Sequence, residues 1–213
     1  FFSDFIPFAA INEILYKSRS FYGVNTVVHS KQLGVNFFYN SGTIHGAQFL
    51  QDKENKKTYY GTIDPLFKNL QQEKQTMTVA IAGLGTGDLA CNARPQDIYS
   101  FYELDPDVVF IASNSKYFTY INNCKPKGGI ILGDARVKIK QEKSNKFDLI
   151  VIDVYSAGTI PKHLLTLDAF SIYKDKLKED GAIAIHVSSA YFNLFPIIKS
   201  IADELNFECL YVD

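Results

Sequence analysis

Residues 79–89, VAIAGLGTGDL, decide how this chain is interpreted. The stretch opens with an apolar run typical of a strand buried on both faces, and it passes directly into Gly83, Gly85 and Gly87. Glycines at this spacing let the backbone turn tightly and approach a ligand with no Cβ in the way, while the amides of the following helix act as donors. The GxGxG pattern therefore predicts a nucleotide site. Because it lacks the last glycine of the dinucleotide pattern GxGxxG, an ordinary turn between strand and helix stays an alternative.

The composition is that of a globular protein with almost no net charge. The chain has 213 residues, of which 46% are hydrophobic and 21% charged, and this length suits one large domain or a domain with a small appendage. A net charge of −1 offers no attraction to nucleic acid or to an anionic membrane. We therefore expect no nucleic-acid partner.

The three cysteines, Cys91, Cys124 and Cys209, are widely separated and form no CxxC motif. Their odd number and their spacing favour reduced thiols in a cytosol over a disulfide framework or a zinc site. We interpret all three as packing residues and expect no metal. The histidines His29 and His45 have no acid or cysteine at ligand spacing, which agrees with that expectation.

The first fifteen residues, FFSDFIPFAAINEIL, are unusually apolar for a chain start. We expect a helix that docks on the domain, with a chain cut from a longer polypeptide as the alternative. No window reaches the roughly 18 apolar residues of a membrane span, and the cationic start of a signal peptide is missing.

The first third of the chain predicts a small antiparallel unit. Residues 21–30, 34–39 and 43–50 are rich in β-branched and aromatic residues, and Asn-Ser-Gly at 40–42 predicts a turn. A charged loop at 52–57 and a helix at 64–72 lead to the glycine stretch. We place an N-terminal helix and β-meander in residues 1–75 and a Rossmann-like catalytic domain in residues 76–213.

The second part alternates strands with helices. Uninterrupted apolar runs predict strands at 98–103, 129–132, 147–152, 182–187 and 207–212, and helical periodicity predicts helices after Pro106 and at 164–177 and 191–205. Repeated βα units mean a mostly parallel sheet covered by helices on both faces, of the seven-stranded type, with its ligand at the carboxyl ends of the strands. The expected fold class is α/β and Rossmann-like, preceded by a small antiparallel β domain.

Three acids fall at the carboxyl ends of successive predicted strands. Glu103, about 20 residues after the glycine turn, is placed to accept hydrogen bonds from ribose hydroxyls. Asp134 is placed to bind an adenine amino group, and Asp153 faces the reacting group. Each acid alone could equally be a solvated residue or a helix cap, but three in register favour one shared site.

Other polar residues leave alternatives open. His163 stands close to the Asp153 loop, so it either reaches the site or lies at the surface. We interpret His186, in a predicted buried strand, as a satisfied core residue. Arg136 either caps the turn at Asp134 or pairs with an acid there.

Four segments resemble the class I S-adenosylmethionine-dependent transferases, and more closely their spermidine synthase (aminopropyltransferase) branch. They are GLGTG at 83–87, YELDP at 102–106, GDAR at 133–136 and DLIVIDVYS at 148–156, in the order and spacing of that branch. Within it, TIHGAQF, TYYG, IPKHLLT and IHVS are most similar to the spermidine-synthase-like domains of bacterial proteins with fused membrane segments.

The resemblance implies transfer of an aminopropyl or other alkyl group to an amine. The donor would be S-adenosylmethionine or its decarboxylated form, bound as co-substrate without a metal, and the acceptor a small amine. The resemblance implies Asp153 as the catalytic base and Tyr59 beside it as a further catalytic residue. The implied nucleoside-binding residues are Gln48, Gly83, Gly85, Thr86, Gly87, Glu103, Leu104, Asp134, Ala135 and Asp153. It implies a cytoplasmic protein, or the cytoplasmic domain of a membrane protein with attached spans. The aromatic strands favour a homodimer.

Two positions depart from the branch. Thr86 stands where an aspartate typically holds the aminopropyl ammonium, and Gly158 stands where a second acid follows the catalytic one. Two anionic contacts for a cationic substrate are therefore missing, which keeps two alternatives open. One is an S-adenosylmethionine-dependent methyltransferase, and the other is a non-catalytic domain that senses an adenosyl nucleoside or a polyamine. A dinucleotide-dependent oxidoreductase is disfavoured by the missing last glycine.

Overall fold

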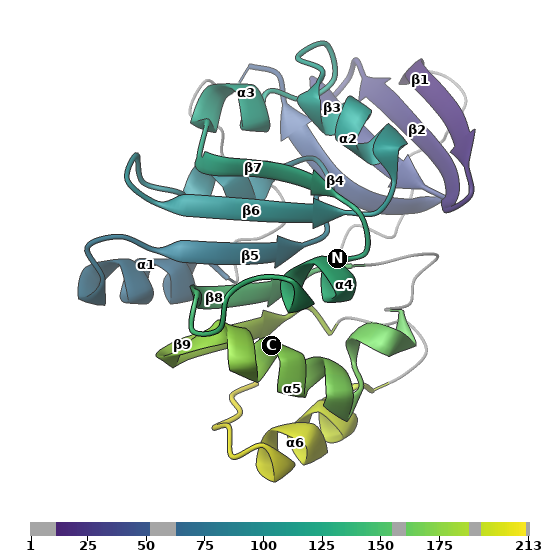
Figure 1. The fold of residues 1–213 in the computed structure, drawn as a ribbon. Coiled ribbons are helices and arrows are strands. Elements are labelled where there is room, and N and C mark those ends of the chain that lie inside the picture. Colours follow the sequence, from purple (N-terminus) through teal and green to yellow (C-terminus); the bar gives the residue numbers. More distant parts are fainter. Residues whose placement is uncertain (1–11, 52–62, 155–160, 188–192, 212–213) are drawn as a thin grey trace.

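The computed structural model describes residues 12–51, 63–154, 161–187 and 193–211, which form two sheets (Figure 1). The N-terminal sheet is antiparallel with strand order β1-β2-β3-β4, and its strands are β1 (Asn12–Ser20), β2 (Gly23–Ser30), β3 (Val35–Asn40) and β4 (Thr43–Phe49). The second sheet is parallel with order β7-β6-β5-β8-β9, and its strands are β5 (Thr78–Ala82), β6 (Ile98–Glu103), β7 (Lys127–Leu132), β8 (Phe147–Ile152) and β9 (Leu177–Ile185). The predicted fold class is confirmed, while the domain boundary near residue 75 stays a prediction.

The parallel sheet is buried on both faces, as its apolar strands predict. In β5, Val79 and Ile81 belong to one hydrophobic cluster and Ala80 and Ala82 to the other, because successive side chains of a strand point to opposite faces. The first face is covered by helices α1 (Asp64–Glu73), α2 (Pro106–Ser113) and α3 (Tyr120–Cys124). The opposite face is covered by α4 (Ala135–Lys140), α5 (Leu167–Lys176) and α6 (Phe195–Glu204). Figure 1 shows α4 next to β8, and α5 and α6 below β9.

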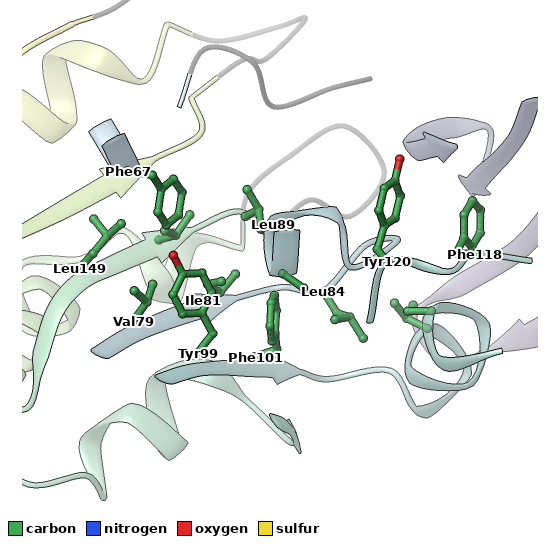
Figure 2. Close-up of a cluster of buried hydrophobic side chains, with 14 of the residues drawn as sticks. Phe67, Val79, Ile81, Leu84, Leu89, Tyr99, Phe101, Phe118, Tyr120 and Leu149 are labelled. Atoms are coloured by element: carbon green, nitrogen blue, oxygen red, sulfur yellow. The ribbon is translucent and has the colours of Figure 1, made fainter. Parts of the chain in front are cut away.

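The first of these clusters continues from the parallel sheet to the N-terminal sheet. Figure 2 shows Phe67 beside Tyr99 at one end of the cluster and Tyr120 and Phe118 at the other, next to the N-terminal strands. Tyr120 also donates its hydroxyl to the carbonyl of Ala47 in β4 at 2.9 Å. The two sheets are therefore parts of one packed body.

The chain start differs from the prediction. Residues 12–15, expected to end a helix, belong to β1, where Asn12 pairs with Ser30 and Ile14 with Val28. The register shifts between Ile14 and Tyr16, and this bulge interrupts the alternation that would have revealed a strand. The predicted helix is therefore wrong for these residues, and the rest of it lies outside the described residues.

Two further elements differ from the prediction. The glycine turn leads into a short 3-10 helix, η1 (Asp88–Asn92), and not into a full α-helix. The predicted last strand is absent from the described part of residues 207–212. There Phe207 bonds back to the carbonyl of Ala202 in α6, and Tyr211 packs on Phe195 at 5.0 Å between ring centroids. The described parallel sheet thus has five strands. None of the described helices has the length and apolar character needed to cross a bilayer.

The cysteine interpretation is wrong for two of the three residues. Cys91 in η1 and Cys124 at the end of α3 form a disulfide, with their Cα atoms 5.0 Å apart. The pairing joins residues 33 apart in sequence and depends on the packing of α3 against η1, which spacing rules do not reveal. Cys209 is a half-buried thiol outside the pair.

Removing the disulfide should lower stability more than removing the thiol. For a closed loop of 33 residues, the constraint on the unfolded chain is worth about 3–4 kcal/mol. We expect the double variant Cys91→Ser, Cys124→Ser to lose about that much in urea unfolding, and Cys209→Ser to change little. Equal stability of the double variant and the unchanged, oxidised protein would contradict the bond.

Candidate active site

The carboxyl edge of the parallel sheet aligns the proposed site residues in one row. Ala82, Ile152 and Ile185 are in register across β5, β8 and β9. The backbone pairing continues beyond them, since Asp153 donates its N–H to Ala82 at 2.9 Å and His186 donates to Ile152 at 3.0 Å. Gly83, Asp153 and His186 therefore stand at the same level of three neighbouring strands.

This row crosses the topological switch point of the sheet. From β5, the chain proceeds to β6 and β7 on one side and later to β8 and β9 on the other. Open α/β sheets bind their ligands at this point, where loops from adjacent strands diverge. Gly83, after β5, and Asp153, after β8, lie at this point.

The glycine loop is closed in by three different elements. An alanine Cβ at Gly83 would lie 2.1 Å from the carbonyl oxygen of Asp153, and one at Gly85 would lie 2.9 Å from that of His45. A Cβ at Gly87 would lie 2.6 Å from Cγ1 of Ile121 in α3. All three have positive φ, so glycine is required for both conformation and space.

Thr86 is buried inside this arrangement. A Cβ on Gly46 in β4 would lie 2.6 Å from Oγ1 of Thr86, so the threonine occupies the space that Gly46 leaves. Within the described part of the chain, Oγ1 of Thr86 has no hydrogen-bond partner. The fourth loop position is therefore a contact to the N-terminal sheet.

Glu103 connects the loop after β5 with the turn after β6. Its carboxylate accepts backbone hydrogen bonds from Leu84 at 3.0 Å, Leu104 at 2.8 Å and Asp105 at 2.9 Å. Burial raises the pKa of the Glu103 carboxyl. The three N–H groups oppose this shift, because their hydrogen bonds favour the ionised form. A carboxylate has about four acceptor sites, so acceptor capacity remains for a ligand hydroxyl. Binding of ribose by Glu103 stays a prediction.

Asp134 begins helix α4 and also contacts a histidine. Its Oδ1 accepts from the backbone of Val137 at 3.0 Å, as a helix N-cap does, and its Oδ2 lies 2.9 Å from Nε2 of His163. His163 thus reaches the rim of the site. Arg136 donates to the carbonyl of His163 at 2.9 Å and lies 4.0 Å from Asp168, so it holds the histidine's segment in place.

Asp153 has two histidines near it. Oδ1 of Asp153 lies 2.8 Å from Nδ1 of His186. The side chains of Asp153 and His186 are 13% and 26% exposed, so His186 is hydrogen-bonded as interpreted but lies partly exposed at the sheet edge and not in the core. Burial lowers the pKa of His45 on β4, and the Asp153 carboxylate opposes that shift. The alignment of residues after β8 and β9 would have revealed the His186 pair, but it requires the strand register.

The remaining predicted site residues differ in burial and in their contacts. Gln48 exchanges two hydrogen bonds of 2.8 Å with the backbone and hydroxyl of Thr119. Leu104 is exposed after β6, with Leu132 and Val137 also exposed at this edge, while Ala135 is buried in the first turn of α4. Tyr59 and Gly158 lie outside the described residues. In the described ranges no cluster of three or more His, Cys, Asp or Glu side chains could hold a metal ion.

Comparison with known proteins identifies the fold. No family model matches the chain. A polyamine aminopropyltransferase from Vibrio vulnificus (strain CMCP6) is 28% identical over 144 residues, which cover 65% of this chain and 47% of that protein. A spermidine synthase from Thermotoga maritima superimposes with a TM-score of 0.65 at 19% identity, over 91% of this chain and 63% of that one. The chain has the spermidine synthase fold.

A second spermidine synthase, in complex with the transition-state analogue AdoDATO, gives a TM-score of 0.64 at 20% identity over 91% of this chain and 62% of that one. The resemblance to the spermidine synthase branch is thus confirmed. The chain spans about half the length of the curated relative that it matches. The narrower resemblance to domains with fused membrane segments stays a prediction.

The contact between Gly83 and Asp153 can be tested by an added methyl group. Gly83→Ala combines strain at φ +93° with a Cβ against a carbonyl, and we expect a loss of about 3 kcal/mol or more. Gly34 is a matched control, because it has φ +62° and open space around a Cβ. Gly34→Ala should cost about 1–2 kcal/mol in urea unfolding. Equal losses in the two variants would contradict the close approach.

Proposed function

We propose that this chain is a spermidine synthase-like transferase that moves an aminopropyl or other alkyl group to an amine acceptor. The donor is decarboxylated S-adenosylmethionine or S-adenosylmethionine. The observation that carries the proposal is the alignment of Gly83, Glu103 and Asp153 along one sheet edge at the switch point. The names of the relatives support the same class of reaction.

The residues at this edge fit an adenosyl nucleoside. Gly83 and Gly85 leave backbone without a Cβ where the sulfur end would approach. Glu103 retains acceptor capacity for ribose hydroxyls. Leu104 and Val137, exposed at the end of β6 and in the first turn of α4, offer apolar contact to adenine, with Asp134 beside them for its amino group.

Asp153 suits the role of base. An amine is protonated at neutral pH, and a carboxylate within hydrogen-bond reach can take its proton as the nitrogen attacks the carbon bound to the sulfonium. The leaving group is a neutral thioether, so the reaction needs alignment more than acid catalysis. Tyr59 and Gln48 complete the proposed set that shapes the pocket.

The nucleoside site is testable without turnover. We expect methylthioadenosine to bind with micromolar affinity in calorimetry, and Glu103→Gln to weaken it at least tenfold, because a charge-assisted hydrogen bond is worth about 1.5–3 kcal/mol. Burial raises the pKa of Glu103, and only the ionised form accepts fully, so affinity should fall as the pH drops through a value above that of an ordinary glutamate. The Glu103→Gln variant should lack this pH dependence, since an amide does not titrate in that range. Absence of any nucleoside binding would overturn the proposal.

The base is tested by separating binding from turnover. Asp153→Asn should reduce kcat by about 100-fold or more while leaving the affinity for methylthioadenosine nearly unchanged. The measurement is product formation by mass spectrometry at saturating donor. Full activity of this variant would exclude Asp153 as the base.

A methyltransferase is the second candidate, and the environment of Thr86 favours it. The position where an aminopropyl ammonium would find an acid is a buried threonine packed on Gly46. The two reactions leave different products, methylthioadenosine from the decarboxylated donor and S-adenosylhomocysteine from S-adenosylmethionine. Incubation with each donor and an amine panel therefore separates them.

A further inference from the structure

The hydrogen bond between Asp153 and His186 links the proposed base to a second titratable side chain. The two atoms, Oδ1 and Nδ1, are 2.8 Å apart. His186 is partly exposed, and its partner is a carboxylate at the site, whereas a purely structural histidine of the core would be buried. This contact is not needed to hold β8 and β9 together, since their backbones pair along the strands.

The backbone fixes both residues before their side chains meet. Asp153 is bonded through its N–H to β5, and His186 through its N–H to β8, at 2.9 and 3.0 Å. Each residue is the first one after its strand, and the strands are in register up to Ile152 and Ile185. The imidazole therefore meets the carboxylate without any adjustment of the main chain.

We propose that His186 is the positioning residue of Asp153 in the transfer reaction, an inference that rests on the proposed function. Its Nδ1–H donates to Oδ1 and fixes the rotation of the carboxyl group about its side-chain bond. Oδ2 then keeps a constant direction toward the acceptor amine, because a carboxylate oxygen has two acceptor sites and remains able to accept from it. In this arrangement the bond also sets the imidazole tautomer.

The chemical step balances with groups already named. One N–H proton of the acceptor ammonium moves to Oδ2 of Asp153, and the nitrogen lone pair forms a bond to the carbon next to the sulfonium. The carbon–sulfur bond breaks, and its electron pair stays on sulfur as a neutral thioether. Asp153 afterwards returns the proton to water. Alignment of the amine lone pair depends on a fixed Oδ2, and a displacement of about 1 Å can cost about 100-fold in rate.

The variants His186→Leu and His186→Asn test whether a hydrogen-bond donor at the position of Nδ1 is needed. Leucine removes the hydrogen bond, and we expect kcat to fall about 10- to 100-fold with the KM of the nucleoside donor unchanged. The amide nitrogen of asparagine lies where Nδ1 lies, so His186→Asn should recover most of kcat. His29 is a matched control, because its Nδ1 also lies 2.8 Å from a side-chain oxygen, that of Asn36, in the N-terminal sheet. His29→Leu should retain kcat.

Nitrogen NMR of labelled histidines tests the contact independently of activity. We expect Nδ1 of His186 to have the chemical shift of a proton-bearing nitrogen, and this shift should change in Asp153→Leu and stay in His29→Leu. Full kcat in His186→Leu, or an Nδ1 without a proton in the unchanged protein, would overturn the inference. If the unchanged protein forms no transfer product with either donor, the proposed function fails, while the nitrogen shifts still decide whether the pair exists.

Discussion

The register of the parallel strands at their carboxyl edge is the constraint on which the site depends. The first residue after each of β5, β7, β8 and β9 donates its backbone N–H to the strand beside it, as from Gly83 to Tyr102 and from Asp153 to Ala82, both at 2.9 Å. These bonds set the level at which every following side chain leaves the sheet. A slip of one residue would turn each strand's core side chains to the other face, so burial of both faces maintains the level. The positions of Glu103, Asp153 and His186 are therefore consequences of core packing.

The N-terminal sheet adds a second constraint, which acts on the glycine loop from the other side. Gly46 and His45 of β4 contact Thr86 and Gly85, so the loop packs between β4 and the edge of the parallel sheet. In this geometry an aspartate at position 86 would be a buried carboxylate against β4, and a buried charge without a partner is costly. The threonine at this position is thus explained by its packing against β4, where an acid would not fit.

Local patterns account for what the sequence predicted well. The apolar run before Gly83 and the acids at 103, 134 and 153 depend on neighbouring residues in the chain, and the strands that position them were predicted within a few residues. Strand β1 was missed because its bulge breaks the alternation between Ile14 and Tyr16. The disulfide and the contact between Asp153 and His186 join residues 33 apart in sequence in both cases, and each depends on how elements pack. Such pairs become visible only when the packing of the elements is known.

The contacts around the glycine loop hold it in one conformation before any ligand binds. The backbone of Asp153 approaches Gly83, β4 approaches Gly85, and Ile121 of α3 approaches Gly87. Helix α3 is in turn bonded covalently to η1, directly after the loop, through Cys91 and Cys124. A loop held on three sides loses little further conformational freedom when a ligand binds, so less of the binding energy is consumed in ordering it. A displacement reaction with a good leaving group depends mainly on alignment. The fold therefore supplies rigidity to the side of the site that would hold the donor, and the hydrogen bond between Asp153 and His186 extends the same rigidity to the proposed base.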